Sequence, residues 1–223
     1  MQMLVTGGDT ELGRVIASGF RNEGHGVLIA GAQRAELEVA AKELDVDYVV
    51  FDNTDPTSLE TARGAFPHYL DGIINVPAPR WDAGDPRTHT LTDRASAWRH
   101  ALDTFVLSAV LTVSILGDQL SSGGSIINVA PANPAEGSAD AAIKAALSNW
   151  TSGQAAHFGV RGITINAIAA GRGVDPGYDG LDGPCGSTAT EITRLALFLT
   201  TPSARHITGE TLHVSHRALA NFG

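Results

Sequence analysis

The sequence predicts an α/β fold: a single doubly wound sheet of about seven parallel strands, with helices on both of its faces. Short apolar runs alternate with amphipathic, helix-like segments from one end of the chain to the other, and this alternation is typical of parallel strands connected by helices. The segment 124–130 (GSIINVA) is apolar along nearly its whole length, as expected of a parallel strand covered on both faces. Both observations indicate one sheet buried between two layers of helices.

The first elements are predicted from residues 3–20 (MLVTGGDTELGRVIASGF). A short apolar run ends at Gly7 and Gly8, and an amphipathic pattern follows around Gly13. This order predicts a strand, a glycine-rich loop and a helix. Backbone N–H groups at the start of such a helix favour a phosphate, so the stretch predicts a dinucleotide site. A tight strand-to-helix turn also needs glycines for steric reasons alone.

The later elements continue the alternation. Asp55 and Pro56 predict a helix start, because an aspartate accepts hydrogen bonds from free N–H groups and a proline fits the first helical position. The polar segment 80–92 is expected to be a surface connection. Further strands are expected at 27–30, 48–51, 72–76, 124–130, 163–168 and 211–214, and further helices at 35–44, 95–116, 141–150 and 191–199.

Composition limits the domain organisation and the partners. At 223 residues the chain is long enough for one well-buried domain, so we expect a single domain spanning 1–223. The formal net charge of −9 argues against nucleic acid and against an anionic membrane surface, because both need a basic face. The apolar stretch 105–116 is too short to span a membrane and is expected to be a buried or interface helix.

Cysteine and histidine usage indicates a reducing compartment and no metal. Cys185 is the only cysteine, so no internal disulfide can form. The first strand begins almost at the first residue, which leaves no room for a signal peptide. The eight histidines show no spacing typical of a metal site. We therefore expect a cytoplasmic protein without a metal centre.

The glycine-rich stretch resembles the TGxxxGxG loop of the short-chain dehydrogenase/reductase family. The motif is matched by Thr6, Gly7, Leu12 and Gly13, with leucine in place of the usual isoleucine. The middle glycine of the motif is Glu11 here, and its carboxylate would repel a pyrophosphate. ITGETLHV at 207–214 is similar to the family's ITGxxLxV ending. The resemblance covers the whole chain and implies a Rossmann fold that binds NAD(P)(H).

The resemblance also implies coenzyme contacts at the ends of other strands. Asp52, beside Asn53, matches the aspartate that meets the adenine amino group, and Asn75 is the one asparagine kept from the Asn-Asn-Ala-Gly motif. No acid follows the second strand to hold a ribose 2′-OH. Arg34, together with Arg14, therefore favours NADP over NAD. The open alternative is that Arg34 is only a solvated charge at a helix start.

The resemblance is weakest at the positions that carry the chemistry. Lys144 matches the lysine of the family's YxxxK motif, and Asp140 replaces the tyrosine that exchanges a proton with the substrate oxygen. The family's catalytic asparagine and serine correspond to Phe105 and Pro131. Asp140 lies one helical turn before Lys144, which predicts an ion pair between them. We favour this structural role of Asp140 over a catalytic one.

The segment 172–190 is rich in glycine, aspartate and proline and resembles the family's variable substrate lid. Tyr178 in this segment is a candidate replacement phenol or, alternatively, part of a hydrophobic wall. Cys185 has no visible base partner in the sequence and is expected to be a bystander.

Two functional hypotheses follow, and the sequence identifies no substrate for either. The first is an NAD(P)(H)-dependent oxidoreductase with a degenerate active site. The second is an inactive, coenzyme-binding pseudo-enzyme that acts in regulation or as a partner subunit. The helices expected at 105–116 and 141–150 are apolar on more than one side, which predicts a homodimer or homotetramer.

Overall fold

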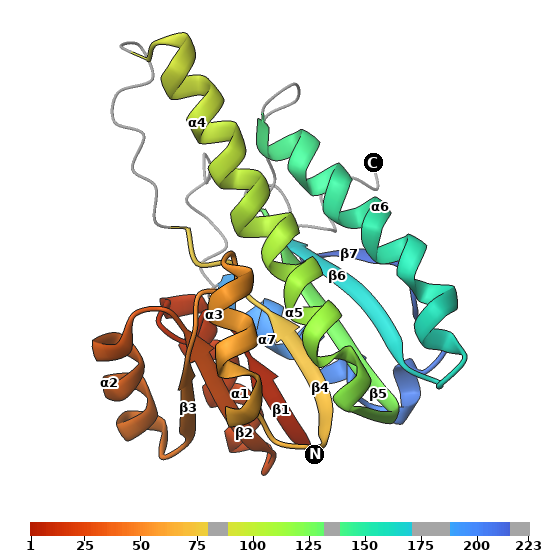
Figure 1. The fold of residues 1–223 in the computed structure, drawn as a ribbon. Helices are drawn as coiled ribbons and strands as arrows, with labels where there is room; N and C mark the ends of the chain where they lie inside the picture. Colours follow the sequence, from red (N-terminus) through yellow and green to blue (C-terminus); the bar gives the residue numbers. More distant parts are fainter. Residues whose placement is uncertain (80–88, 132–138, 171–187, 215–223) are drawn as a thin grey trace, which may run out of the picture.

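The computed structural model describes residues 1–79, 89–131, 139–170 and 188–214, and a parallel sheet forms the centre of this part of the chain (Figure 1). The strands are hydrogen-bonded in the order β3-β2-β1-β4-β5-β6-β7, and every neighbouring pair is parallel. The strands are β1 (Gln2–Val5), β2 (Gly26–Gly31), β3 (Asp47–Val50), β4 (Leu70–Asn75), β5 (Leu120–Ala130), β6 (Thr164–Ala170) and β7 (Thr211–Val214). The predicted fold class is confirmed.

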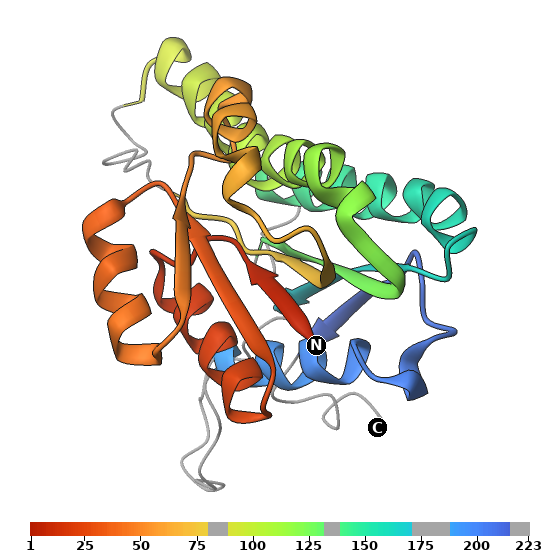
Figure 2. The ribbon, with the colours of Figure 1, turned by 60° about the horizontal axis from the view of Figure 1, so that its bottom comes forward.

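Helices cover both faces of the sheet (Figure 2). One layer contains α1, α2 and α7, and the other contains α3, α4, α5 and α6. The helices are α1 (Glu11–Asn22), α2 (Arg34–Leu44), α3 (Pro56–Ala62), α4 (Leu91–Leu102), α5 (Ser108–Leu116), α6 (Ala139–Gly159) and α7 (Thr188–Leu199). From β1 the chain adds β2 and β3 on one side of the sheet, and then β4 to β7 on the other side. The strand order therefore reverses between β1 and β4.

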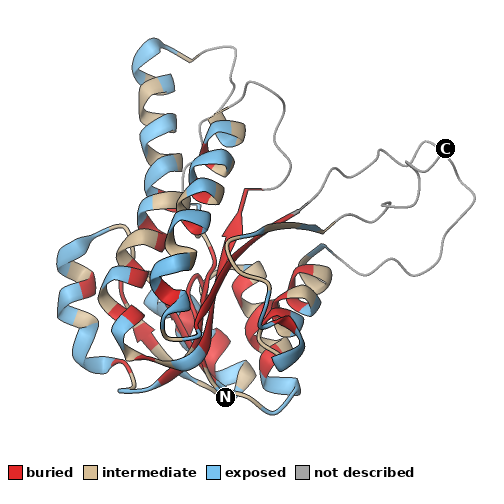
Figure 3. Cartoon of the chain, turned by 90° about the vertical axis from the view of Figure 1, so that its right-hand side faces the viewer, coloured by how far each residue is buried: buried red, intermediate tan, exposed pale blue. Residues whose placement is uncertain are grey.

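The strands are buried between the two helical layers (Figure 3). Their buried residues are mostly apolar on both faces of the sheet. On one side Ile16 and Phe20 of α1 pack with Ile192 of α7. On the other side Leu59 of α3 and Leu116 of α5 pack against the same strands. Because both faces are covered, the ends of the strands are where a ligand can reach the sheet.

A chain of buried polar side chains connects the sheet to α6. Asn75 Nδ2 donates to Asn128 Oδ1 at 2.8 Å, and Asn128 Nδ2 donates to Thr151 Oγ1 at 3.0 Å. Each of these three residues is at most 5% exposed. A buried amide is costly to leave unpaired, so these hydrogen bonds hold β4, β5 and α6 in one arrangement.

Of the elements that begin earlier than the sequence predicted, α4 and β5 differ most, by four residues each. The helix expected at 95–116 begins at Leu91, because Thr90 and Asp93 form a capping box in which each side chain accepts from the other's backbone N–H. The expected surface connection at 80–92 therefore ends before this helix. The strand expected at 124–130 begins at Leu120, which pairs with Leu70 of β4.

A π-helical turn, η3 (Asp103–Leu107), separates α4 from α5. The helical run from Leu91 to Gln119 has the length and mean hydropathy of a membrane-spanning helix, and 39% of its most apolar window is buried. Within this run, Val113 and Leu116 of α5 pack in the core between the sheet and the layer of α3, α5 and α6. This burial agrees with the expectation of a buried helix at 105–116, and a core helix also explains the high hydropathy.

Candidate functional site

The candidate site lies at the carboxyl ends of β1 and β4, where the strand order reverses. Ligands of open α/β sheets bind in the crevice at such a switch point. Thr6 follows β1, and its backbone N–H donates to the Ile74 carbonyl at 3.0 Å. The Thr6 hydroxyl accepts from the Val76 N–H at 2.9 Å and donates to the Val76 carbonyl at 3.3 Å. Thr6 therefore joins the two strand ends to each other.

Glycines bring the start of α1 against this junction. Gly7 has a φ of +61°, and a Cβ there would lie 2.6 Å from the Val76 carbonyl oxygen. A Cβ on Gly13 would overlap the Gly7 carbonyl oxygen. Thr10 caps α1, accepting from the Gly13 N–H at 3.1 Å. The other N–H groups of the first turn have no intrahelical partner, as at every helix start, and they are available to an anion.

A cavity of about 500 Å³ opens at this edge of the sheet, within the usual range for ligand pockets. Its walls come from the start of α1, the segment after β4, η3, the end of β5 and the start of α7. Leu12, Pro77, Val129 and Ile192 make most of this lining apolar. Glu11 is the one charged side chain among the described lining residues.

Two of the four positions that the resemblance assigns to catalysis meet in this cavity. Phe105 lies in the π-helical turn η3, and Pro131 is buried directly after the end of β5. Both residues line the cavity. Neither side chain has a hydrogen-bond donor or an ionisable group, so neither can take part in a proton transfer.

The predicted ion pair between Asp140 and Lys144 is not formed. Among the described residues, no carboxylate oxygen lies within 4.0 Å of the Lys144 ammonium. Asp140 is exposed in the first turn of α6, where the helix macrodipole stabilises a carboxylate. Lys144 is partly buried one turn later. That prediction was wrong, because the helix start and solvent stabilise Asp140 without Lys144.

The charge of Lys144 acts on His213 of β7, a residue that was not predicted to belong to the site. Partial burial lowers the pKa of Lys144 below its usual 10.5. Partial burial and, second, the positive charge of Lys144 lower the pKa of His213 below its usual 6.5. The imidazole and the ammonium are therefore close enough to interact. No sequence pattern indicates this pair, because α6 and β7 approach each other only in the folded sheet.

Asp52 and Asn53 follow β3, as predicted, but the Asp52 carboxylate also shapes the turn into α3. Asp52 Oδ1 accepts from the Thr54 N–H at 2.9 Å and from the Thr54 hydroxyl at 2.7 Å. Asp55 caps α3 by accepting from the Thr57 N–H at 3.0 Å, which confirms its predicted role. An adenine contact by Asp52 stays a prediction.

Asn75 lies at the end of β4 beside the switch point, but its side chain points into the scaffold. Its Nδ2 donates to Asn128, and its Oδ1 is buried without a hydrogen-bond partner among the described residues. Asn75 does not line the 500 Å³ cavity. The geometry therefore gives Asn75 a structural role, and direct coenzyme binding by its amide stays a prediction.

Arg34 begins α2 at the end of β2, the place where the sequence predicted a 2′-phosphate. Its guanidinium is exposed and lies 3.6 Å from the Glu38 carboxylate. Arg14, the second arginine of that prediction, donates to Glu36 Oε2 at 2.8 Å. Both arginines are thus paired with carboxylates of α2. The preference for NADP stays a prediction.

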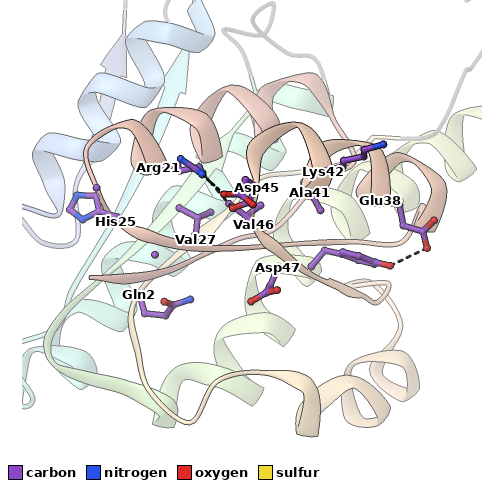
Figure 4. A pocket seen from close by; sticks show the side chains of 13 residues that line it. Gln2, Arg21, His25, Val27, Glu38, Ala41, Lys42, Asp45, Val46 and Asp47 are labelled. Carbon is purple, nitrogen blue, oxygen red and sulfur yellow. Dashed lines mark hydrogen bonds and ion pairs between the residues drawn. The ribbon is translucent and has the colours of Figure 1, made fainter.

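A larger cavity, of about 810 Å³, lies at the amino ends of β2 and β3 (Figure 4). Arg21 and Asp45 form a 2.7 Å ion pair at its rim, and the Tyr48 hydroxyl donates to Glu38 Oε1 at 3.0 Å. This cavity is at the opposite end of the sheet from the glycine loop and the start of α1. The cavity at the carboxyl edge, which includes the start of α1, is therefore the candidate site.

Several predicted features lie outside the described residues: Tyr178, Cys185 and most of the expected lid at 172–190. Within the described part of the chain, no group of three or more His, Cys, Asp or Glu side chains is placed to hold a metal ion.

Comparisons with known proteins agree with this geometry. The family profile described as enoyl-(acyl carrier protein) reductase matches residues 9–216. One relative is a protein of Mycobacterium tuberculosis strain H37Rv named "Putative oxidoreductase Rv1856c". It is 66% identical over 223 residues, and the alignment covers 100% of both chains. Staphylococcus aureus FabG, named as a 3-oxoacyl-acyl-carrier-protein reductase, is 27% identical over 241 residues, with 95% of each chain covered.

Solved structures show the same fold. One structure, described as a short chain dehydrogenase/reductase family protein, superposes with a TM-score of 0.77 and 26% sequence identity. The superposition covers 97% of this chain and 96% of the other. The overall fold of this chain is therefore shared with that structure.

The proximity of Lys144 and His213 leads to the first prediction. In the Lys144→Met protein the pKa of His213 should rise toward 6.5, because the ammonium that opposes imidazole protonation is gone. The folded wild type binds the proton of the His213 imidazole less tightly than the unfolded chain does. Protonation of His213 therefore lowers the free energy of unfolding as the pH falls below about 6.5. NMR titration of the imidazole resonances would measure the pKa, and denaturant unfolding at several pH values would measure the change in stability.

His25 is the internal control for this titration. Its pKa is also lowered, but by burial and then by the N-terminal ammonium, so Lys144→Met should leave it unchanged. An unmoved His213 pKa in the variant would show that the two side chains are not neighbours.

Proposed function

Because this chain belongs to the short-chain dehydrogenase/reductase family, we propose that it is an NAD(P)(H)-dependent oxidoreductase with a degenerate active site. Members of this family bind NAD(P)H. The observation that carries the proposal is the 500 Å³ cavity at the switch point, in which the start of α1 meets Phe105 and Pro131. When bound, the coenzyme supplies the hydride, so the protein must orient the reactants and supply the proton.

The residues present fit a dinucleotide in shape. Gly7 and Gly13 place the start of α1 at the crevice, so that first-turn N–H groups can hold a pyrophosphate. Lys144, in the second turn of α6, is the residue that we propose binds the nicotinamide ribose. The charge of Glu11 in the cavity opposes the pyrophosphate. We therefore expect binding that is real but weak.

The proton supply is the part of the site that we propose is missing. Phe105 and Pro131 fill the cavity wall where the family has an amide and a hydroxyl, and Asp140 is an exposed carboxylate on α6. A carboxylate that points into solvent is poorly placed to supply a proton to a substrate oxygen. Asp140 is also shorter than the tyrosine it replaces.

These replacements also support a second candidate function. A protein that keeps the coenzyme site and lacks proton donors can act as a pseudo-enzyme, in regulation or as a partner subunit. Fold alone does not separate this candidate from an active oxidoreductase. Measured coenzyme binding without turnover on any carbonyl substrate would favour the pseudo-enzyme.

The second prediction concerns coenzyme affinity. Glu11→Gln and Glu11→Gly should each tighten the binding of NADH and NADPH about five- to tenfold, because they remove a negative charge beside the pyrophosphate. Isothermal titration calorimetry would measure the dissociation constants. Glu23→Gln, at the other end of α1, is the matched control and should change neither.

No heat with either reduced coenzyme at millimolar concentration, in the wild type and in Glu11→Gly, would show that the site does not bind a dinucleotide. Unchanged affinity in both Glu11 variants, with binding present, would contradict the repulsion argument alone.

The third prediction is that ordinary carbonyl reduction is absent or very slow. Proton donation contributes about 10²- to 10⁴-fold to such reactions, and the groups that supply it are replaced here. A panel of ketones and quinones with NADH or NADPH, followed by coenzyme absorbance, should stay close to background. Asp140→Tyr alone should not restore activity, because Pro131 and Phe105 still lack a hydroxyl and an amide.

Robust reduction of an ordinary ketone by the wild type, lost on changing Asp140 or Tyr178, would contradict this proposal. It would identify a substitute acid that serves in place of the missing tyrosine.

The fourth prediction is a homodimer or homotetramer. Trp98, Leu102 and Leu107, on α4 and η3, are each at least 37% exposed, and such apolar side chains favour burial against another copy. Leu102→Glu should reduce the mass measured by light scattering to that of the monomer. Val160→Glu, at an 89% exposed apolar residue elsewhere, is the control. A monomeric wild type at micromolar concentration would contradict the prediction.

A further inference from the structure

Asp9 brings a carboxylate to the end of β2, although it belongs to the loop after β1. Its Oδ2 accepts from the backbone N–H groups of Ala32, at 3.2 Å, and Gln33, at 3.0 Å. These two residues form the turn between β2 and α2. The carboxylate is therefore held at the carboxyl end of the strand by two hydrogen bonds.

Gly31, the last residue of β2, makes room for this carboxylate. A Cβ on Gly31 would overlap Asp9 Oδ1 and would lie within 2.9 Å of Oδ2. The backbone of β2 and the Asp9 side chain are thus in close contact. Any other residue at this position would push the carboxylate away from the strand end.

Within the described part of the chain, Arg14 and Arg34 near this point are each paired with a glutamate of α2. Arg14 donates to Glu36, and Arg34 lies 3.6 Å from Glu38. Asp9 therefore adds a negative charge to two arginine–glutamate pairs. The formal charges of these five side chains sum to −1, and the Asp9 carboxylate lies against Gly31, the last residue of β2.

We infer that Asp9 makes this chain prefer NAD(H) over NADP(H); the inference rests on the proposed function. In doubly wound folds, an acid at the end of the second strand favours a ribose 2′-OH and a cation accommodates a 2′-phosphate. The sequence after β2 contains no such acid, but the fold supplies one from the neighbouring loop. A phosphate group carries about −1.5 to −2 charges at neutral pH, and the Asp9 carboxylate opposes it.

This inference disagrees with the sequence-based expectation of NADP, which depended on Arg34. The Arg34 guanidinium is exposed to solvent, where screening weakens its attraction for a phosphate. Asp9 is less exposed and is fixed by two backbone N–H groups. The Asp9 carboxylate should therefore have a larger effect than the Arg34 guanidinium on which coenzyme binds more tightly.

Calorimetric titration of the full chain with NADH and with NADPH tests the inference. The wild type should bind NADH about tenfold more tightly than NADPH, as expected for one like charge near a partly solvated phosphate. Asp9→Asn keeps an oxygen acceptor for Ala32 and Gln33 and removes the charge, so it should reduce that ratio about tenfold. Arg34→Ala should leave the ratio nearly unchanged.

Glu11→Gln is the matched control, because it removes a carboxylate near the pyrophosphate that both coenzymes share. It should change both affinities by the same factor and leave their ratio constant. Tighter binding of NADPH by the wild type, or an unchanged ratio in Asp9→Asn, would overturn the inference while leaving the proposed function intact. If neither coenzyme binds to the wild type or to Glu11→Gln, the inference and the proposed function are both wrong.

Discussion

The contact between the ends of β1 and β4 is the constraint on which the rest of the site depends. The Thr6 hydroxyl exchanges hydrogen bonds with both backbone groups of Val76, so the two strand ends cannot separate. Gly7, in the left-handed region, then turns the chain over the Val76 carbonyl, and Gly13 lets α1 begin directly against the Gly7 carbonyl. The position of the helix start, and hence of the cavity, follows from these contacts between backbone atoms.

This constraint applies to the residues that hold the backbone in place and not to the side chains that line the cavity. The glycines are required for packing whether or not a ligand binds, and the buried Asn75, Asn128 and Thr151 side chains are required for internal hydrogen bonding. Phe105 and Pro131 carry no such requirement, since an apolar side chain of suitable volume fills the cavity wall equally well. A chain can therefore keep the fold and the shape of this cavity while the side chains that line it change.

The fold could be predicted from the sequence because its signals are local, whereas several features of the site depend on contacts between distant residues. Alternating apolar runs gave the strands, and the Asp55 cap was readable from two adjacent residues. The start of α4 was missed although Thr90 and Asp93 have capping-box spacing. Asp9 at the end of β2 and His213 beside Lys144 were not predictable, because each requires knowing which strand or helix lies next to which.

The start of α1 also shows why affinity and selectivity depend on different residues. Glu11 lies in the first turn of α1, where a carboxylate typically stabilises a helix by about 0.3–1 kcal/mol through the macrodipole. The same N-terminal field would attract a pyrophosphate, so the side chain that stabilises the free helix competes with the ligand. In the proposed binding mode Glu11 would act on the pyrophosphate that NAD and NADP have in common, whereas Asp9 would act at the end of β2, where the two coenzymes differ. The two carboxylates are separated by one residue in sequence, but the turn into α1 directs them to different parts of the site, so each can change without altering the effect of the other.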